Sequence, residues 1–449
     1  MNKVPLFILL FLLTTGTFTT TLSSVLASSE LVEDSWTTLT SMDDPCSGLG
    51  LVAVNGKLYA IGGIASVDTL GRLDRVIVGD SECYDPATDT WTTLKPMPTP
   101  RCNFIIVTCQ GKIYCIGGED GPIYPLGPSV LHPLDIVEVY DPLIDVWESR
   151  ASIPINIQHD MQAQVVKDQI FIITSKGELY MYNTIADKWS LKTPLPAKEK
   201  PLQTLVINEQ LFVITQSIMY MYNPVTGTWL NKTNMPASMI YAFSDVMDNK
   251  IVVGDFLLIP STETIWMGLF NAQLRVSIYD PTSGVWFEGK TTDEHIFATN
   301  PIFNGATVIM TSDVYAPKNV YVLGIEATKE DLMNVKPFTW VYDPVSDVWS
   351  TAKVVDTAPY IRGCTIVVVD DIFYIVSDNF NVKYVPAGYN SQGHPNTQTS
   401  ATAPSKSGYM WSFLTGRVVL AIIILVIVAF AVIVLSLFFY MCKRKRTVQ

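Results

Sequence analysis

Apolar residues in this chain come in short runs separated by turn residues, from about Ser35 to Val385. One such unit is the run Leu51 to Val54, the pair Asn55-Gly56, and a second run from Lys57 to Ile61. Asn-Gly between two apolar, β-branched runs is a strong hairpin signal. The pattern therefore predicts an all-β chain built from short antiparallel strands.

A second hairpin signal recurs downstream of each such unit. A tyrosine is followed seven residues later by a tryptophan, and most copies have Asp-Pro or Asn-Pro directly after the tyrosine. These residues, with Asp or Gly two positions before the tryptophan, fit a tight turn between two strands. The complete copies are Tyr84 to Trp91, Tyr140 to Trp147, Tyr182 to Trp189, Tyr222 to Trp229, Tyr279 to Trp286 and Tyr342 to Trp349.

A seventh copy is split between the two ends of the repeat array. Tyr384-Val385-Pro386 has the tyrosine half, and Trp36 has the tryptophan half. Successive tryptophans are about 40 to 63 residues apart, which brackets the period of propeller blades with four strands each. We expect a ring of seven blades, in which the segment around Ser35 to Thr40 supplies the outer strand of the blade formed by Thr365 to Val385.

A blade cannot bury both faces alone, so neighbouring blades must pack radially. A large aromatic side chain between blades fills the wedge-shaped gap. Complete burial of one indole stabilises the fold by at most about 4 to 6 kcal/mol. Closure of the ring also removes free sheet edges.

At this point the chain resembles the kelch-repeat family. The resemblance rests on Gly62-Gly63, Gly117-Gly118 and the tyrosine-to-tryptophan spacings, and it covers about Ser35 to Val385. Thr174-Ser175, Thr215-Gln216 and Val376-Ser377 stand where the glycine pair is expected in later repeats. The resemblance implies a seven-bladed kelch-type β-propeller, here residues 29–386.

The N-terminal residues 1–28 are typical of a secretory signal peptide. A basic start at Lys3 precedes an apolar run from Val4 to Leu13, and small residues lie around Ala27. This run is short for a membrane span. An uncleaved anchor is the alternative.

The C-terminal part predicts a membrane anchor. Residues 417–441 contain a long apolar run without charge from Val418, enough for a transmembrane helix. The basic tail, residues 442–449, follows and is placed in the cytoplasm by the positive-inside rule. Residues 387–416, which are rich in Ser, Thr, Gly and Pro, are predicted to form a flexible stalk. A buried globular helix is the alternative for the apolar run.

Charge argues against one class of partner. The chain has a formal net charge of −12, and without the six cations of its two ends the expected ectodomain carries about −18. We therefore expect no nucleic-acid partner. Asn231-Lys232-Thr233 is a candidate glycosylation site if that segment is extracellular. The cysteines permit disulfides outside the cell, with buried free thiols as the alternative.

Residues with catalytic chemistry are sparse. Four histidines occur, and no pair has the spacing of a metal-binding helix or of a Cys-x-x-Cys site. We expect no metal site, no cofactor and no catalytic residue. Because some secreted kelch-like propellers are copper oxidases or sialic-acid isomerases, the resemblance leaves catalysis open as an alternative, and fold alone does not assign function.

Propeller sites are usually built from loops around one mouth of the central channel. The connections that enter each inner strand contain four candidates for polar contacts with a ligand: Arg101, His159, His295 and Arg362. Two guanidinium groups near one mouth are suited to a carboxylate or sulfate. The alternative is that each arginine pairs with a neighbouring acid.

The connections between second and third strands differ greatly in length. The sequence predicts inserts of about Ala65 to Asp80, Glu119 to Asp135, Phe256 to Leu274 and Gly324 to Thr339, and almost none in blades three and four. The third insert carries an apolar cluster that includes Trp266. This cluster is either a binding patch or a lid packed on the ring.

These features predict a single-pass cell-surface protein with an exterior propeller that binds a glycan or a protein. Arg101, Arg362, His159, His295 and Trp266 are the predicted ligand contacts. A membrane-anchored carbohydrate-active enzyme of isomerase or oxidase type is one alternative. A structural envelope component is the other.

Overall fold

The structure is a computed structural model that describes residues 32–43, 46–69, 72–123, 130–155, 161–196, 199–236, 243–259, 270–292, 296–298, 307–327, 335–354, 365–376 and 381–393. The regular elements in these ranges are β-strands. Within the same ranges no helix is long and apolar enough to cross a membrane. The predicted signal peptide, transmembrane helix and basic tail lie outside the described residues and stay predictions.

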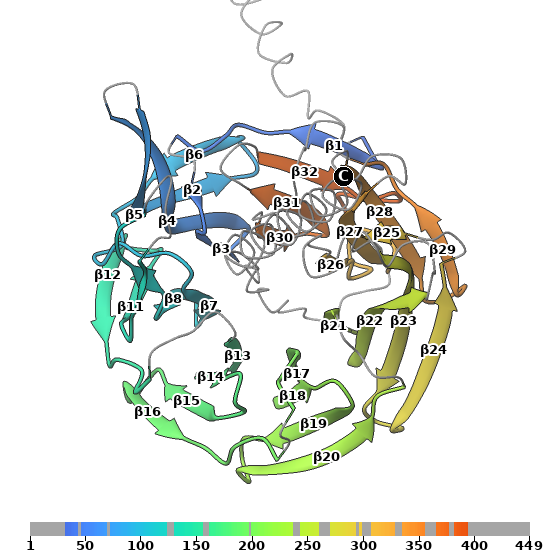
Figure 1. Cartoon of the computed structure of the whole chain (residues 1–449). Coiled ribbons are helices and arrows are strands. Elements are labelled where there is room, and N and C mark those ends of the chain that lie inside the picture. Colours follow the sequence, from blue (N-terminus) through green and yellow to red (C-terminus); the bar gives the residue numbers. More distant parts are fainter. Residues whose placement is uncertain are drawn as a thin grey trace, which may run out of the picture.

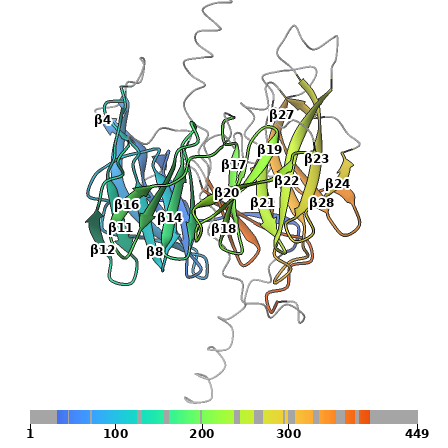
Figure 2. The same cartoon turned by 90° about the horizontal axis from the view of Figure 1, so that it is seen from below.

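Seven sheets, each with four antiparallel strands as its body, are arranged in a ring (Figure 1), which confirms the predicted seven-bladed β-propeller. Figure 2 shows the ring from the side. From inner to outer strand, blade one has β3 (Gly50–Val54), β4 (Lys57–Thr69), β5 (Arg72–Asp85) and β6 (Thr90–Thr93), and blade two has β7 (Ile105–Cys109), β8 (Lys112–Ile116), β11 (Val137–Asp141) and β12 (Val146–Arg150). Blade three has β13 (Gln162–Val166), β14 (Gln169–Ile173), β15 (Leu179–Asn183) and β16 (Lys188–Leu191), blade four has β17 (Gln203–Ile207), β18 (Gln210–Ile214), β19 (Ile218–Asn223) and β20 (Thr228–Asn234), and blade five has β21 (Phe243–Met247), β22 (Lys250–Ile259), β23 (Phe270–Asp280) and β24 (Val285–Thr291). Blade six has β26 (Thr307–Met310), β27 (Val320–Ala327), β28 (Val335–Asp343) and β29 (Val348–Thr351), and blade seven has β30 (Thr365–Val369), β31 (Ile372–Val376), β32 (Asn381–Val385) and β1 (Ser35–Thr38). Four short strands lie beside these: β2 (Cys46–Ser47), β9 (Glu119–Asp120), β10 (His132–Pro133) and β25 (Ile296–Ala298).

The first hairpin forms where the sequence predicts it. Val54 pairs with Lys57 across the turn. Asn55 and Gly56 have φ angles of 50° and 76°, and a type I′ turn needs positive φ at both central positions. Its left-handed backbone matches the twist of the flanking strands, so the two apolar runs pair in register.

The ring closes through the split repeat. Strand β1 pairs antiparallel with β32, and Trp36 lies opposite Tyr384 in that ladder. The N-terminal segment therefore supplies the outer strand of blade seven, as predicted.

The core lies at the junctions between blades. Each of the apolar clusters in the described ranges joins two neighbouring blades; one, for example, combines Val107 of blade two with Ile170 of blade three. The repeat tyrosines are almost completely buried in these junctions, with at most 1% of their surface exposed. The repeat tryptophans are only partly buried, so complete burial of the indole overstates their contribution. The fully buried tyrosines are Tyr84, Tyr140, Tyr182, Tyr222, Tyr279, Tyr342 and Tyr384.

A recurrent set of hydrogen bonds, here termed the aspartate–tryptophan clasp, connects consecutive blades. In blade two, Asp145 accepts the Tyr140 hydroxyl at 2.8 Å and the backbone N–H of Lys95 at 3.1 Å. The Trp147 indole N–H donates to the carbonyl of the same lysine at 2.9 Å. One residue of the preceding connection is thus held at both its N–H and its carbonyl. Equivalent clasps use Asp34 with Trp36, Asp89 with Trp91, Asp187 with Trp189, and Asp347 with Trp349.

Blades four and five lack the aspartate of the clasp. Gly227 and Gly284 occupy its position with φ angles of 68° and 73°. Trp229 still donates to the Thr193 carbonyl, and Trp286 donates to the Thr233 hydroxyl. Within the described ranges the buried Tyr279 hydroxyl has no hydrogen-bond partner.

The two faces of the ring differ. We call the face with the connections between second and third strands, and between successive blades, the upper face; the opposite face is the lower face. Three predicted inserts are largely strand rather than loop. Strand β4 pairs with β5 as far as Thr69 and Arg72, β22 with β23 as far as Ile259 and Asn271, and β27 with β28 as far as Ala327 and Val335. The blade-one hairpin projects beyond the rest of its blade (Figures 1 and 2).

The chain after blade seven docks on the lower face. The Tyr389 ring stacks on Tyr315 with centroids 6.2 Å apart, and the Asn390 N–H donates to the Tyr315 carbonyl at 2.6 Å. Tyr315 belongs to the turn between β26 and β27. The first residues of the predicted stalk, as far as Gly393, are therefore packed against blade six.

Candidate functional site

Arg101 is the one predicted ligand contact whose side chain the structure describes. It has no accessible surface, and its Nη1 lies 2.5 Å from Glu138 Oε2. Nη2 also donates to the Cys115 carbonyl, and the guanidinium lies over the Phe104 ring at 5.5 Å. Arg101 therefore pairs with a neighbouring acid, which is the alternative stated above. That acid, Glu138, lies on the third strand of the same blade. This buried ion pair connects the segment before β7 to the third strand of blade two.

The other predicted contacts, His159, His295, Arg362 and Trp266, lie outside the described residues, so their roles stay hypotheses. The backbone of Asn231 lies in β20, an outer strand. Thr233, the third residue of its glycosylation motif, accepts the Trp286 indole hydrogen bond in the junction with blade five. The position on the outer rim of the ring suits a modification site, and glycosylation stays a prediction.

The described cysteines are buried thiols, which is the alternative to the disulfides that the sequence permits. Cys46, Cys83, Cys102, Cys109 and Cys115 are buried and form no disulfide. Burial raises the pKa of Cys102 and of Cys115 to about 12, so both remain protonated thiols at neutral pH. Among the described residues no group of three or more His, Cys, Asp or Glu side chains is placed to hold a metal ion.

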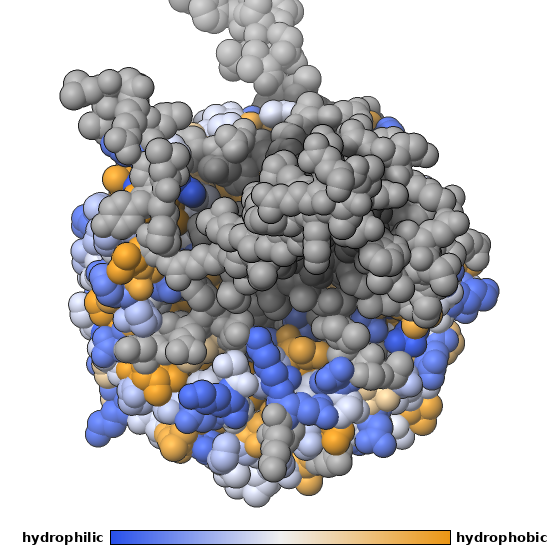
Figure 3. All heavy atoms as spheres, in the orientation of Figure 1, coloured by the Kyte–Doolittle hydropathy of each residue, from blue (hydrophilic) through white to orange (hydrophobic). Residues whose placement is uncertain are grey.

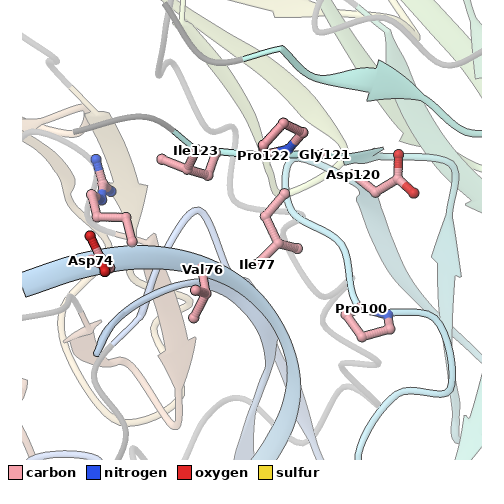
Figure 4. A pocket seen from close by; sticks show the side chains of 9 residues that line it. Asp74, Val76, Ile77, Pro100, Asp120, Gly121, Pro122 and Ile123 are labelled. Carbon is pink, nitrogen blue, oxygen red and sulfur yellow. The ribbon is translucent and has the colours of Figure 1, made fainter. Parts of the chain in front are cut away.

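The structure reveals a groove that the sequence did not identify. It lies on the upper face between blades one and two and has a volume of about 480 Å³ (Figure 4). We call it the blade 1–2 groove. Its lining residues are Asp74, Arg75, Val76, Ile77, Pro100, Asp120, Gly121, Pro122 and Ile123.

Strand β5 forms the first wall of this groove. Its N-terminal half pairs with the extended part of β4, and Ser66 lies opposite Arg75. On the far side β4 pairs with β2, where Cys46 lies opposite Ala65. The Arg75 guanidinium donates to the Ser47 hydroxyl at 2.6 Å, which ties the hairpin to β2. The wall is therefore a small sheet that the ring holds at its base.

The segment after β8 forms the second wall. Cys102 and Glu119 exchange backbone hydrogen bonds of 3.0 and 2.8 Å, and the Asn103 amide donates to the Glu119 carboxylate at 2.9 Å. This places Asp120 and Pro122 across from β5, as Figure 4 shows. The wall is thus fixed by the same connection that buries Arg101.

A glycine pair makes room for this arrangement. Gly118 has a φ of 100°, and a Cβ there would lie 2.8 Å from the Cys102 carbonyl oxygen. In blade one, a Cβ on Gly63 would lie 2.8 Å from the Ser47 carbonyl oxygen. The pair lets the preceding connection run directly over the end of the second strand. Blades one and two, which have this pair, are the ones that form the groove.

The groove has a mixed lining. Valine, isoleucine and proline side chains make the apolar part, and Asp74, Arg75 and Asp120 make the charged part. His132 Nδ1 lies 3.8 Å from Asp120 Oδ1. The described part of the face seen in Figure 3 likewise scatters hydrophobic residues among hydrophilic ones. Such a surface can hold both apolar and basic groups of a ligand.

Comparison with family models supports the repeat assignment. The Kelch motif matches residues 45–98 and 100–154, which cover the blades that form the groove. Kelch-like protein 35 of Mus musculus is 28% identical over 167 residues. The chain contains kelch repeats. The resemblance drawn from the glycine pairs and the tyrosine-to-tryptophan spacing is thereby confirmed.

The kelch relatives are similar to only part of the chain. The Kelch-like protein 35 match covers 36% of this chain and 26% of that protein. The Influenza virus NS1A-binding protein homolog of Mus musculus is 43% identical over 75 residues, 17% of this chain and 10% of that protein. Kelch-like ECH-associated protein 1A of Danio rerio is 39% identical over 84 residues, 19% of this chain and 13% of that protein. The chain thus spans about a quarter or less of these relatives.

The solved structure of YjhT is similar to part of this chain. It is 10% identical to this chain, and the match covers 71% of this chain and 100% of YjhT with a TM-score of 0.43.

The sequence contained a partial signal for the groove. The unequal lengths of the segments Ala65 to Asp80 and Glu119 to Asp135 marked blades one and two as different from blades three and four. It did not show that Asp74 and Asp120 face one groove, because this depends on how far the β4–β5 hairpin extends and on the bridge between Cys102 and Glu119.

Proposed function

We propose that this kelch propeller is the exterior part of a single-pass cell-surface protein and that its upper face binds a partner protein. Kelch propellers act as protein-binding scaffolds, and two of the relatives are named for association with another protein. The observation that carries the proposal is the blade 1–2 groove, a concave surface of mixed polarity whose walls are held by backbone hydrogen bonds.

The position of the segment after blade seven supports this orientation. The segment around Tyr389 docks on the lower face, opposite the groove. An anchor in the predicted span 417–441 would follow this segment through the remaining stalk. The groove would then point away from the membrane, where a partner can reach it.

Two measurements test this proposal. In cells that express the full chain, an epitope inserted after Ser28 should be stained without permeabilisation, and an epitope after Gln449 only with it. The purified full-length protein in detergent should bind saturably to members of an array of extracellular protein domains. Staining of the C-terminal epitope on intact cells, or an array without any saturable protein binding, would contradict the proposal.

The same array format separates the alternatives. Saturable binding to glycans without chemical change would support the glycan-binding alternative, and conversion of the bound sugar would support the carbohydrate-active enzyme. Concentration-dependent self-association without any ligand would support the structural component.

A further inference from the structure

The outer edge of β5 is unpaired over part of its length within the described ranges. In the projecting part of the hairpin the sheet order is β2, β4, β5, so β5 is the edge strand. Strand β6 pairs with β5 only from Glu82 to Asp85, and two further bonds reach Ser81 and Gly79. From Arg75 to Val78, β5 has no backbone partner other than β4 within the described ranges. This free edge lies along the groove.

The opposite wall is unsuited to complete the ladder with β5. Pro100 and Pro122 have no N–H to donate. The Pro122 carbonyl already accepts the Val130 N–H at 3.3 Å. The groove therefore separates the β5 edge from a wall that offers it little backbone pairing.

We propose that the blade 1–2 groove binds an extended segment of the partner protein, which adds as a strand to β5 along Arg75 to Val78. The proposal rests on the proposed function, since the occupant belongs to the bound protein. An unpaired row of N–H and C=O groups is matched by another extended backbone, and strand addition at a sheet edge is a common mode of peptide recognition. About four paired residues would span roughly 13 Å of strand.

Side chains of the groove define the composition of that segment. Val76, Ile77 and Ile123 line it together with the prolines, so residues that face the walls should be apolar. The lining has two carboxylates, those of Asp74 and Asp120, and one guanidinium, that of Arg75. Arg75 donates to Ser47, and Asp120 lies 3.8 Å from His132. In a chain of net charge −12 the groove favours a lysine or arginine in the bound segment.

The test is the selection of a random peptide library on the full-length protein in detergent. We expect selected peptides in which apolar residues surround a basic one. The variant Val76→Lys places bulk and positive charge in the groove and should weaken their binding by about tenfold or more. Val225→Lys is the matched control, because Val225 is 90% exposed on the lower face and Val76 is 39% exposed. Equal thermal unfolding midpoints of both variants would exclude misfolding.

Methylation of backbone nitrogens in a selected peptide tests strand addition itself. Pairing along one edge uses the N–H groups of alternate residues. N-methylation at alternate positions should therefore weaken binding by about tenfold or more, and the positions between should tolerate it. Tolerance at all positions, with binding still sensitive to Val76→Lys, would overturn strand addition and leave the proposed function standing. Peptides that are all indifferent to Val76→Lys, or an empty selection, would overturn the groove as the site.

Discussion

Trp36 lies opposite Tyr384 across the ladder that closes the ring, with ring centroids 4.9 Å apart. Tyr140 and Trp147 belong to one unbroken repeat, and their ring centroids are 5.1 Å apart. The split repeat thus reproduces the contacts of an unbroken one. The ends of the array are joined by the same clasp that connects interior blades.

Loss of the closing tryptophan should destabilise the propeller as much as loss of an interior one. Trp36→Ala removes the bond to the Lys353 carbonyl and the packing on Tyr384. We expect a decrease of about 3 kcal/mol in the free energy of unfolding, and a similar value for Trp147→Ala. Chemical denaturation of the full chain measures both. An unchanged stability for Trp36→Ala would contradict closure by β1.

Completion of the clasp in blade five should stabilise the fold. A Cβ at Gly284 would lie 3.9 Å from the Tyr279 hydroxyl, which lacks a partner. Aspartate adopts the required positive φ at the equivalent positions in other blades. We expect Gly284→Asp to raise the free energy of unfolding by about 1 kcal/mol. The control Gly56→Asp, with no atom within 4 Å of its Cβ, should show no gain. A destabilised Gly284→Asp would contradict the role of the clasp.

Acid should weaken the clasps. Hydrogen bonds from the Lys95 N–H and the Tyr140 hydroxyl lower the pKa of Asp145, and bonds from Tyr182 and the Ala151 N–H lower that of Asp187. A carboxyl group whose pKa is lower in the folded state stabilises the fold above its unfolded pKa of about 3.9. This contribution disappears as pH falls through the lower folded pKa.

The free energy of unfolding should therefore be nearly constant from pH 7 to about 5 as far as these groups are concerned, and should fall below about pH 4. Asp145→Ala should be less stable at neutral pH and should lose less on acidification. A pH series of urea titrations measures both. An identical acid dependence in the wild type and in Asp145→Ala would contradict this account.

The buried ion pair of Arg101 should be costly to break and inexpensive to replace. Glu138→Ala leaves a guanidinium without accessible surface and without its carboxylate, and we expect a loss of about 3 to 5 kcal/mol. The double variant Arg101→Met with Glu138→Leu should recover most of this loss, because both charges are gone. A double variant as unstable as Glu138→Ala would show that the charges themselves are needed.

Local turn chemistry made most of the fold predictable. The positions of Asn55-Gly56 and of the aspartates before the tryptophans specify backbone angles that hardly depend on distant residues. The split repeat predicted closure because its two halves are recognisable at opposite ends of the chain. The sequence did not show that the tyrosine would be buried more completely than the tryptophan, since this depends on the angle at which blades pack.

The site was less predictable because it depends on contacts between distant segments. The sequence suggested Arg101 as a ligand contact. In the folded blade Glu138, which comes from another strand, lies beside it. The segments around Arg75 and Asp120 resembled irregular inserts, because polar residues interrupt their alternation. Pairing of β4 with β5, and not local propensity, makes one of them a regular wall of the groove.

The partner protein is expected to contact the groove between blades one and two. A photo-crosslinking amino acid at position 76 or at position 225 of the full chain, presented to a protein found on the array, tests it most directly. We expect a covalent product from position 76 and none from position 225, although Val225 on the lower face is the more exposed of the two. A product from position 225 alone would contradict it.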